Sequence, residues 1–225
     1  VVLHVNHSVL LVASWAMVTE LLGYDIIWIL SYGPSFTLLL TRSNLGHLTN
    51  GRMAWNILTG YLDSAAKAFG RRKQLAHYDR YAMGEEYMEV MYKLWEGSWE
   101  EGAVLRDKEK RVFAQADKIH KVVHDGEYFQ LDAYHLCEPS PQRTPILFQA
   151  GASTRGREFA SKHAECMFIS GFSFKAVARI VADIRKRTAA QGRDPASVII
   201  YTALTVICGA TDEEAQEKYE DYRKY

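Results

Sequence analysis

Residues 149–160, QAGASTRGREFA, have the composition of an anion-binding turn. Gly151 permits close approach of the backbone to a ligand, and Ser153 or Thr154 can cap the helix expected to follow. The free N–H groups at the start of a helix attract anions such as phosphate. Two side chains add positive charge nearby: Arg155 and Arg157. The segment is a candidate phosphate site, and the alternative is a plain strand-to-helix turn with a serine cap.

A second segment, WNILTGYLDSA at 55–65, combines an amide, a hydroxyl and aromatic rings where a strand is expected to end. Asn56 and Thr59 can hydrogen-bond to a polar heterocycle, as the few polar groups of a cofactor pocket do. The alternative is that both side chains satisfy backbone groups of the loop.

A third segment, QLAHYDRY at 74–81, places His77 and Tyr81 four residues apart. On a helix this spacing puts both side chains on one face. Together they can hold a phosphate or act as acid and base, so His77 is the candidate catalytic residue. The alternative is that His77 caps the helix and Tyr81 packs in the core.

The elements that must position these segments alternate between strands and helices. Short apolar runs predict strands at 26–30, 53–58, 145–150, 166–169 and 198–207. Helical spacing predicts helices at 8–22, 35–46, 79–96, 153–163, 174–191 and 211–224. Within the charged and aromatic stretch 97–144, Asp125-Gly126 predicts a hairpin. This order predicts one α/β domain, 1–225, with a parallel sheet, either doubly wound or part of a (β/α)₈ barrel.

Composition excludes several classes of protein. Lysine plus arginine and aspartate plus glutamate number 27 each, so no basic excess indicates a nucleic-acid or anionic-membrane partner. The three cysteines lack C-x-x-C spacing, so we expect no disulfide framework, no metal site and a reducing cytoplasm. Polar residues interrupt the apolar N-terminal runs, so we expect no membrane span. The start at Val1 predicts a missing N-terminal portion rather than a signal peptide.

Other residues with reactive or aromatic side chains are expected to be structural. They are His47, the loosely spaced His120, His124 and His135, the inert thiol of Cys137, and the core pair Trp95 and Trp99.

Taken together, these segments resemble one family. The strings LGHLTNGRMAWNILTGYLDSAAKAFG, KQLAHYDRY and PILFQAGASTRGREFASKHAECMFIS look like the large component of nitrilotriacetate monooxygenase and its relatives. These relatives are bacterial luciferase-like, FMN-dependent enzymes and include dibenzothiophene-sulfone and long-chain alkane monooxygenases. The resemblance runs from about Ser14 to Tyr225 and is densest at 47–171.

The resemblance implies a luciferase-type (β/α)₈ barrel with an inserted segment around 97–144, and with N- and C-terminal strands missing from this chain. It implies that a separate flavin reductase supplies reduced FMN, which reacts with O₂ through a C4a-(hydro)peroxyflavin to oxygenate a small organic substrate. It also implies a homo-oligomer. With strands missing, we expect these 225 residues alone to be poorly stable and inactive.

By position, the resemblance also implies cofactor-binding residues. Asn56 and Thr59 match residues beside the flavin ring, and His77 and Tyr81 match residues lining the flavin and its phosphate side. The phosphate loop is matched by Gly151, Ala152 and Ser153.

The chain departs from the family pattern at three places. In the string Ile29-Leu30-Ser31-Tyr32, Leu30 stands where the family has a threonine near the flavin. Just before this string, Trp28 replaces a small residue and is expected to crowd the barrel. Further along the chain, Gly46 replaces an acidic residue. These departures favour an alternative, a truncated or degenerate homologue that retains a flavin or phosphate site or a role in oligomer assembly. A third alternative, a deazaflavin-dependent barrel, is disfavoured by the QAGAS and HYDRY strings.

Overall fold

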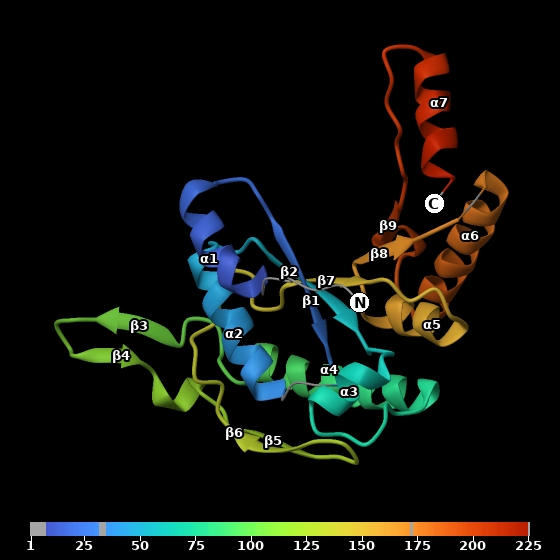
Figure 1. Cartoon of the computed structure of the whole chain (residues 1–225). Coiled ribbons are helices and arrows are strands. Elements are labelled where there is room, and N and C mark those ends of the chain that lie inside the picture. Colours follow the sequence, from blue (N-terminus) through green and yellow to red (C-terminus); the bar gives the residue numbers. More distant parts are fainter. Residues whose placement is uncertain (1–7, 32–34, 172, 225) are drawn as a thin grey trace.

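The computed structural model describes residues 8–31, 35–171 and 173–224. Its centre is a five-stranded parallel sheet in the order β1-β2-β7-β8-β9 (Figure 1). The strands are β1 (Tyr24–Ile29), β2 (Met53–Leu58), β7 (Ile146–Gln149), β8 (Cys166–Ile169) and β9 (Ile199–Thr202). Two separate antiparallel hairpins are built from β3 (Val104–Asp107) with β4 (Val112–Ala114), and from β5 (Val122–Asp125) with β6 (Gln130–Ala133).

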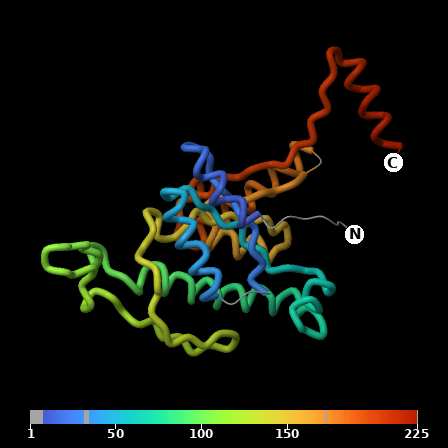
Figure 2. The backbone as a smooth tube through the Cα atoms, turned by 60° about the vertical axis from the view of Figure 1, so that its left-hand side comes forward, coloured from blue at the N-terminus to red at the C-terminus, as the bar shows by residue number. Residues whose placement is uncertain are grey.

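The helices connect the parallel strands. They are α1 (Ser8–Val18), α2 (Ser35–Leu48), α3 (Asp63–Ala68), α4 (His77–Gly97), α5 (Thr154–His163), α6 (Phe174–Ala190) and α7 (Asp212–Tyr222). Two short 3₁₀ helices, η1 (Ala116–Lys118) and η2 (Pro195–Ser197), lie in connecting segments. Five of the α-helices contact one another in the order α1, α2, α4, α5, α6, so they form a layer beside the sheet. Both views show α7 extending away from that layer (Figures 1 and 2).

The main core lies between the sheet and α4. Successive strand residues face opposite sides of a sheet, so Trp55 and Ile57 point to the helices together. The Trp55 ring lies 6.1 Å from the rings of Tyr87 and Trp95, centroid to centroid, and all three are buried. Burial of these large aromatic rings stabilises the contact between the sheet and the helix layer. The prediction that Trp95 packs in the core is confirmed.

The opposite face of the sheet is formed by the strand residues that alternate with those packed against the helices. Phe148, Phe168 and Tyr201 form a ladder of rings across β7, β8 and β9, with centroids 5.4–5.9 Å apart. Much of this face is exposed: Ile27 is 58% exposed and Ile199 is 54% exposed. We call it the inner face, because it is the side away from the helix layer.

The predicted strands are all present, and most predicted helices match within three residues. The exceptions lie near the ends of the chain: the helix predicted at 8–22 ends at Val18, and the strand predicted at 198–207 ends at Thr202. The hairpin predicted at Asp125-Gly126 is β5–β6. The hairpin β3–β4 and the short helix α3 were not predicted, because their sequences lack a clear period.

The predicted effect of Trp28 is wrong. Trp28 does not crowd the inner face, because it packs against the main core on the helix side. Leu30 is buried in the same core and reaches α4 at Gly84, where an added Cβ would lie 3.1 Å from Leu30 Cδ1. Gly46 allows close approach of Ser140, which an added Cβ would meet at 2.7 Å. Tyr32 lies outside the described residues.

The inserted segment is attached to the helix layer through a buried histidine. His135 Nε2 lies 3.0 Å from Ser43 Oγ on α2, and the His135 backbone N–H donates to Ser98 Oγ at 2.9 Å. Trp99 Nε1 donates to the His135 carbonyl at 2.8 Å. Burial, together with the nearby His47, lowers the pKa of His135 to about 4. This histidine is therefore neutral in the folded protein near pH 7.

We predict that His135 makes the fold sensitive to mild acid. Its pKa is lower in the folded state than its ordinary value of 6.5, so between these values the unfolded chain binds a proton that the folded chain does not. The stabilisation is complete above pH 6.5 and is lost as the pH falls through about 4. A shift of this size corresponds to about 3 kcal/mol.

Urea unfolding of the wild type and His135→Gln at several pH values measures this effect. The variant lacks the titrating group, so the difference in unfolding free energy between the two proteins should shrink by about 3 kcal/mol from pH 7 to pH 4. A difference that stays constant over this range would contradict the assignment.

Among the described helices, none is both long enough and apolar enough to cross a membrane.

Candidate functional site

A cavity of about 290 Å³ lies where β1, β2 and β7 end. Parallel strands present their carboxyl ends on one edge, which is where α/β proteins bind ligands. Four residues predicted from three separate segments line this cavity: Thr59, His77, Tyr81 and Gly151. The structure therefore brings the three segments together.

The start of α4 forms one wall of the cavity. His77 is the first residue of the helix, and its ring centroid lies 5.2 Å from that of Tyr81. Tyr81 is buried, with its ring 5.7 Å from Phe159 on α5. Ala76, not His77, is the N-cap residue, and no side chain caps the helix. The alternative that His77 caps α4 is therefore wrong, whereas Tyr81 does pack in the core.

The QAGAS turn forms the facing wall. An added Cβ on Gly151 would lie 2.9 Å from Tyr81 Oη, and one on Gly156 would lie 2.7 Å from the same oxygen. The Tyr81 hydroxyl therefore lies so close to Gly151 and Gly156 that neither position can hold a residue larger than glycine. Gln149, which is buried at the end of β7, folds back to accept a hydrogen bond from the Gly151 N–H. These contacts place the turn beside the cavity.

Ser153 is the N-cap of α5, and its Oγ accepts a hydrogen bond from the Gly156 N–H at 3.0 Å. The serine cap predicted as the alternative is thus present. A cap of this kind satisfies one N–H of the first turn, and the N–H groups of Thr154 and Arg155 remain without a partner inside the helix. Ala152 and Ser153 are exposed and do not line the cavity itself.

Asn56 lies below the cavity on the inner face rather than in its wall. Its Nδ2 donates to Asp25 Oδ2 at 3.4 Å, and its Oδ1 is buried without a hydrogen-bond partner among the described residues. Burial raises the pKa of Asp25, and the Asn56 hydrogen bonds and the Arg42 charge only partly offset this. Asn56 thus binds a carboxylate and not the loop backbone.

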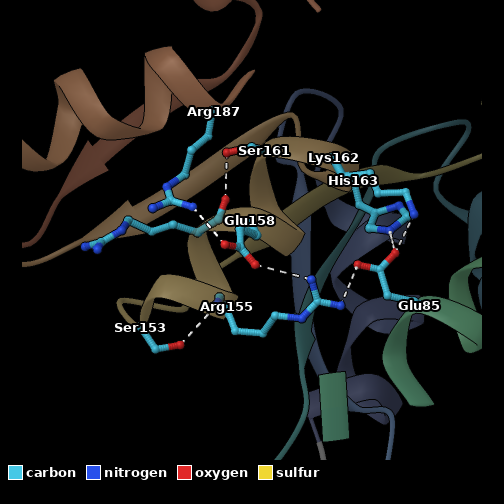
Figure 3. A network of polar contacts seen from close by, with 10 residues as sticks. Glu85, Ser153, Arg155, Glu158, Ser161, Lys162, His163 and Arg187 are labelled. Carbon is cyan, nitrogen blue, oxygen red and sulfur yellow. Dashed lines mark hydrogen bonds and ion pairs between the residues drawn. The ribbon is translucent and has the colours of Figure 1, made fainter. Parts of the chain in front are cut away.

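The positive charges expected from Arg155 and Arg157 are already neutralised, which corrects the sequence prediction. Arg155 lies 3.6 Å from Glu85 on α4 and 3.3 Å from Glu158 (Figure 3). Arg157 lies 2.8 Å from Asp183 on α6. Both guanidinium groups therefore join α5 to its neighbouring helices instead of facing the cavity.

Glu85 joins α4 to the end of α5. It accepts hydrogen bonds from Lys162 at 2.6 Å and from His163 at 3.0 Å (Figure 3). Burial raises the pKa of Glu85, but the hydrogen bonds and charges of His163 and Lys162 outweigh burial and bring it to about 2. This network joins α4, whose first turn lines the cavity, to α5, which follows the QAGAS turn at the facing wall.

Two cavity residues were missed by the sequence analysis. Arg80 lines the cavity; its Nη1 donates to the Leu75 carbonyl at 2.7 Å, and its Nε is buried without a partner among the described residues. An anionic ligand would satisfy such a donor. Gln149 is the other. Arg80 follows His77 by three residues on the same helix face, and Gln149 opens the QAGAS string, so both signals were present.

Among the described residues, the other histidines and cysteines form no comparable site. Within the described ranges, no group of three or more histidine, cysteine, aspartate or glutamate side chains lies close enough to hold a metal ion. His47 Nε2 lies 3.0 Å from the Glu138 carbonyl of the inserted segment, and His124 lies 3.1 Å from Glu86. Burial raises the pKa of the Cys137 thiol, which makes it a poor nucleophile.

The chain resembles known monooxygenases over most of its length. Residues 36–225 match the protein family described as luciferase-like monooxygenase. A long-chain alkane monooxygenase of Geobacillus thermodenitrificans is 46% identical over 98% of this chain and 50% of its own. A dimethyl-sulfide monooxygenase of Hyphomicrobium sulfonivorans is 48% identical over 95% of this chain and 45% of its own. Nitrilotriacetate monooxygenase component A of Aminobacter aminovorans is 35% identical over 93% and 46%.

Solved structures are also similar to nearly the whole of this chain. The crystal structure of a long-chain alkane monooxygenase superposes with a TM-score of 0.94 at 45% identity, covering 99% of this chain and 51% of that one. A riboflavin lyase crystallised with modified FMN and riboflavin superposes with a TM-score of 0.92 at 37% identity, covering 96% and 48%. The chain thus spans about half the length of the relatives that it matches.

Proposed function

Because this chain belongs to the luciferase-like monooxygenase family, as the sequence predicted, we propose that it is the flavin-binding part of the oxygenase component of a two-component monooxygenase. In this proposal, reduced FMN and O₂ oxygenate a small organic substrate. The predicted α/β fold is confirmed, and the five described parallel strands form part of a (β/α)₈ barrel of the luciferase type.

One observation carries the proposal: Thr59, His77, Tyr81 and Gly151 meet in one cavity at the carboxyl edge of the sheet. The residues present fit FMN. The N-terminus of α5 suits a phosphate, because Gly151 and Gly156 leave its backbone open to a close approach. The Arg80 Nε, which has no hydrogen-bond partner among the described residues, suits a negative charge.

In this proposal, the residues around the cavity have distinct roles. Bound FMN supplies the oxygen-activating chemistry, which no side chain here can perform. Tyr81 and the first turn of α5 hold the phosphate, and apolar residues such as Ile29 and Leu58 exclude water from the ring. The imidazole of His77 can accept or donate a proton at a ring nitrogen facing the cavity.

Three further parts of the proposal concern partners and location. A separate flavin reductase supplies the reduced FMN, which is supported by relatives named as a component A and as an FMNH₂-dependent enzyme. The cytoplasm is the proposed location, supported by three free cysteines. A homo-oligomer stays a prediction.

The test is a titration of the full-length protein with FMN, followed by oxygen uptake with FMN and a flavin reductase across alkanes, sulfides, sulfones and aminopolycarboxylates. We expect saturable FMN binding and substrate-dependent uptake. Absence of FMN binding would refute the flavin site, whereas binding without uptake on any substrate would favour the non-catalytic alternative.

We predict that His77 and Tyr81 support the flavin more than the fold. Removing the phenol oxygen in Tyr81→Phe keeps the ring packing against Phe159 and removes a phosphate donor, so FMN affinity should fall by about tenfold, equivalent to a lost charge-assisted hydrogen bond of ~1.5 kcal/mol. His77→Ala should lower coupled turnover or affinity in the same way. Thermal unfolding should change little in either variant. A large drop in melting temperature with normal FMN binding would favour a purely structural role.

A further inference from the structure

The segment between α3 and α4 carries an unusual concentration of unpaired positive charge. Four basic residues lie within it or at the end of α3: Lys67, Arg71, Arg72 and Lys73. Within the part of the chain that the structure describes, none of them forms an ion pair. Lys67, Arg72 and Lys73 are exposed, and Arg71 is half-buried. By contrast, Arg155, Arg157 and Arg187 around α5 are all paired with carboxylates.

Backbone contacts hold this basic segment beside the cavity. The Arg71 N–H donates to the Ala66 carbonyl on α3 at 3.0 Å, and the Gln74 N–H donates to Asp63 Oδ1 at 2.9 Å. Arg80 Nη1 donates to the Leu75 carbonyl, which connects the segment to the first turn of α4. Leu62 and Ala65 before this segment line the cavity, and so do His77 and Arg80 after it, so the basic segment connects two parts of the cavity wall.

The two acidic residues nearby do not cancel this charge. Asp63, which accepts the Gln74 backbone N–H, and Asp79, in the first turn of α4, supply two negative charges. The basic residues supply five positive charges: Lys67, Arg71, Arg72, Lys73 and Arg80. The segment from Lys67 to Arg80 therefore keeps a positive excess, with Arg80 as its innermost member in the cavity wall.

We propose that the basic segment 67–73 attracts the phosphate group of the flavin and guides it into the cavity. This inference rests on the proposed function, since it assumes that FMN is the ligand. A phosphate monoester carries a charge of about −1.5 to −2 at neutral pH. Clustered charges of opposite sign beside a cleft raise association rates by roughly 10- to 1000-fold, with an effect that salt screens over about 10 Å at 0.1 M.

Stopped-flow measurement of FMN binding tests the proposal. The variant reverses two exposed charges, Arg72→Glu with Lys73→Glu. The matched control is Lys108→Glu with Arg111→Glu in the turn between β3 and β4. Both residues are exposed, form no ion pair among the described residues, and change the net charge equally. Both views place this hairpin at the opposite end of α4 from the basic segment (Figures 1 and 2).

At low ionic strength, the association rate constant for FMN should fall by about tenfold in the test variant and stay near the wild-type value in the control. The difference should vanish at about 0.5 M salt. The dissociation rate constant should not change. Riboflavin, which lacks the phosphate, should bind all three proteins at the same rate.

Three outcomes would overturn the inference while leaving the flavin site intact: equal FMN association rates in all proteins, an equal fall in both variants, or an equal slowing of riboflavin and FMN. The first would show no steering, the second an effect of net charge, and the third a distorted loop. If neither flavin binds to the wild type, the proposed function fails together with the inference.

Discussion

Replacing Ser153 with aspartate is expected to weaken FMN binding by about 10- to 100-fold, equivalent to losing one charge-assisted contact of ~1.5–3 kcal/mol. The substitution is informative because aspartate caps a helix as well as serine does. The new carboxylate can accept the Gly156 N–H that Ser153 Oγ now accepts at 3.0 Å. The fold should therefore keep its stability, while the added negative charge repels a phosphate at the first turn of α5.

The neighbouring helix offers a matched control. Ser173 is the N-cap of α6 and accepts the Ala176 N–H at 3.2 Å, so Ser173→Asp adds the same charge in the same local setting. Fluorescence titrations should show weaker FMN binding only for Ser153→Asp, with partial recovery at high salt. Riboflavin affinity should be equal in both variants. Equal FMN affinity in Ser153→Asp and wild type would exclude α5 as the phosphate site.

Much of the fold could be predicted because its signals are local. The strand at Met53–Leu58 was predicted with its observed bounds, since a buried parallel strand is a short apolar run between turn residues. The pairing of His77 with Tyr81 followed from helical spacing alone. The serine cap at Ser153 followed from the small residues around it. The meeting of these segments in one cavity follows from the shared carboxyl edge of parallel strands.

The errors arise where distant elements decide the outcome. The sequence around Arg155 and Arg157 shows two free positive charges, but their partners Glu85 and Asp183 come from α4 and α6. Similarly, whether Trp28 faces the helices or the inner face depends on strand register, which a change of one residue reverses. Arg80 and the basic segment 67–73 instead carry positive charges that remain unpaired among the described residues.

Replacing Glu86 with alanine is expected to destabilise the protein by about 3–5 kcal/mol, the usual cost of removing one partner from a buried charged network. Glu86 lies on α4 and accepts three hydrogen bonds from the β5–β6 hairpin: from the Tyr128 N–H at 3.0 Å, the Phe129 N–H at 2.7 Å and His124 at 3.1 Å. Burial raises the pKa of Glu86, but the Tyr128 and Phe129 N–H groups and His124 outweigh burial and hold this pKa below its ordinary value, so the carboxylate is charged near neutral pH.

The same helix supplies the control for this prediction. Glu89 pairs with Lys93 at 2.7 Å, but its side chain is 57% exposed, so Glu89→Ala should cost less than about 1 kcal/mol. Urea unfolding compares the two variants. Hydrogen exchange should also show faster exchange at the Tyr128 and Phe129 amides in Glu86→Ala, because both lose their acceptor. If both variants unfold at the same urea concentration, Glu86 does not hold the hairpin. In that case, the position of α4, and with it the cavity wall at His77, is set by the aromatic core around Trp55 alone.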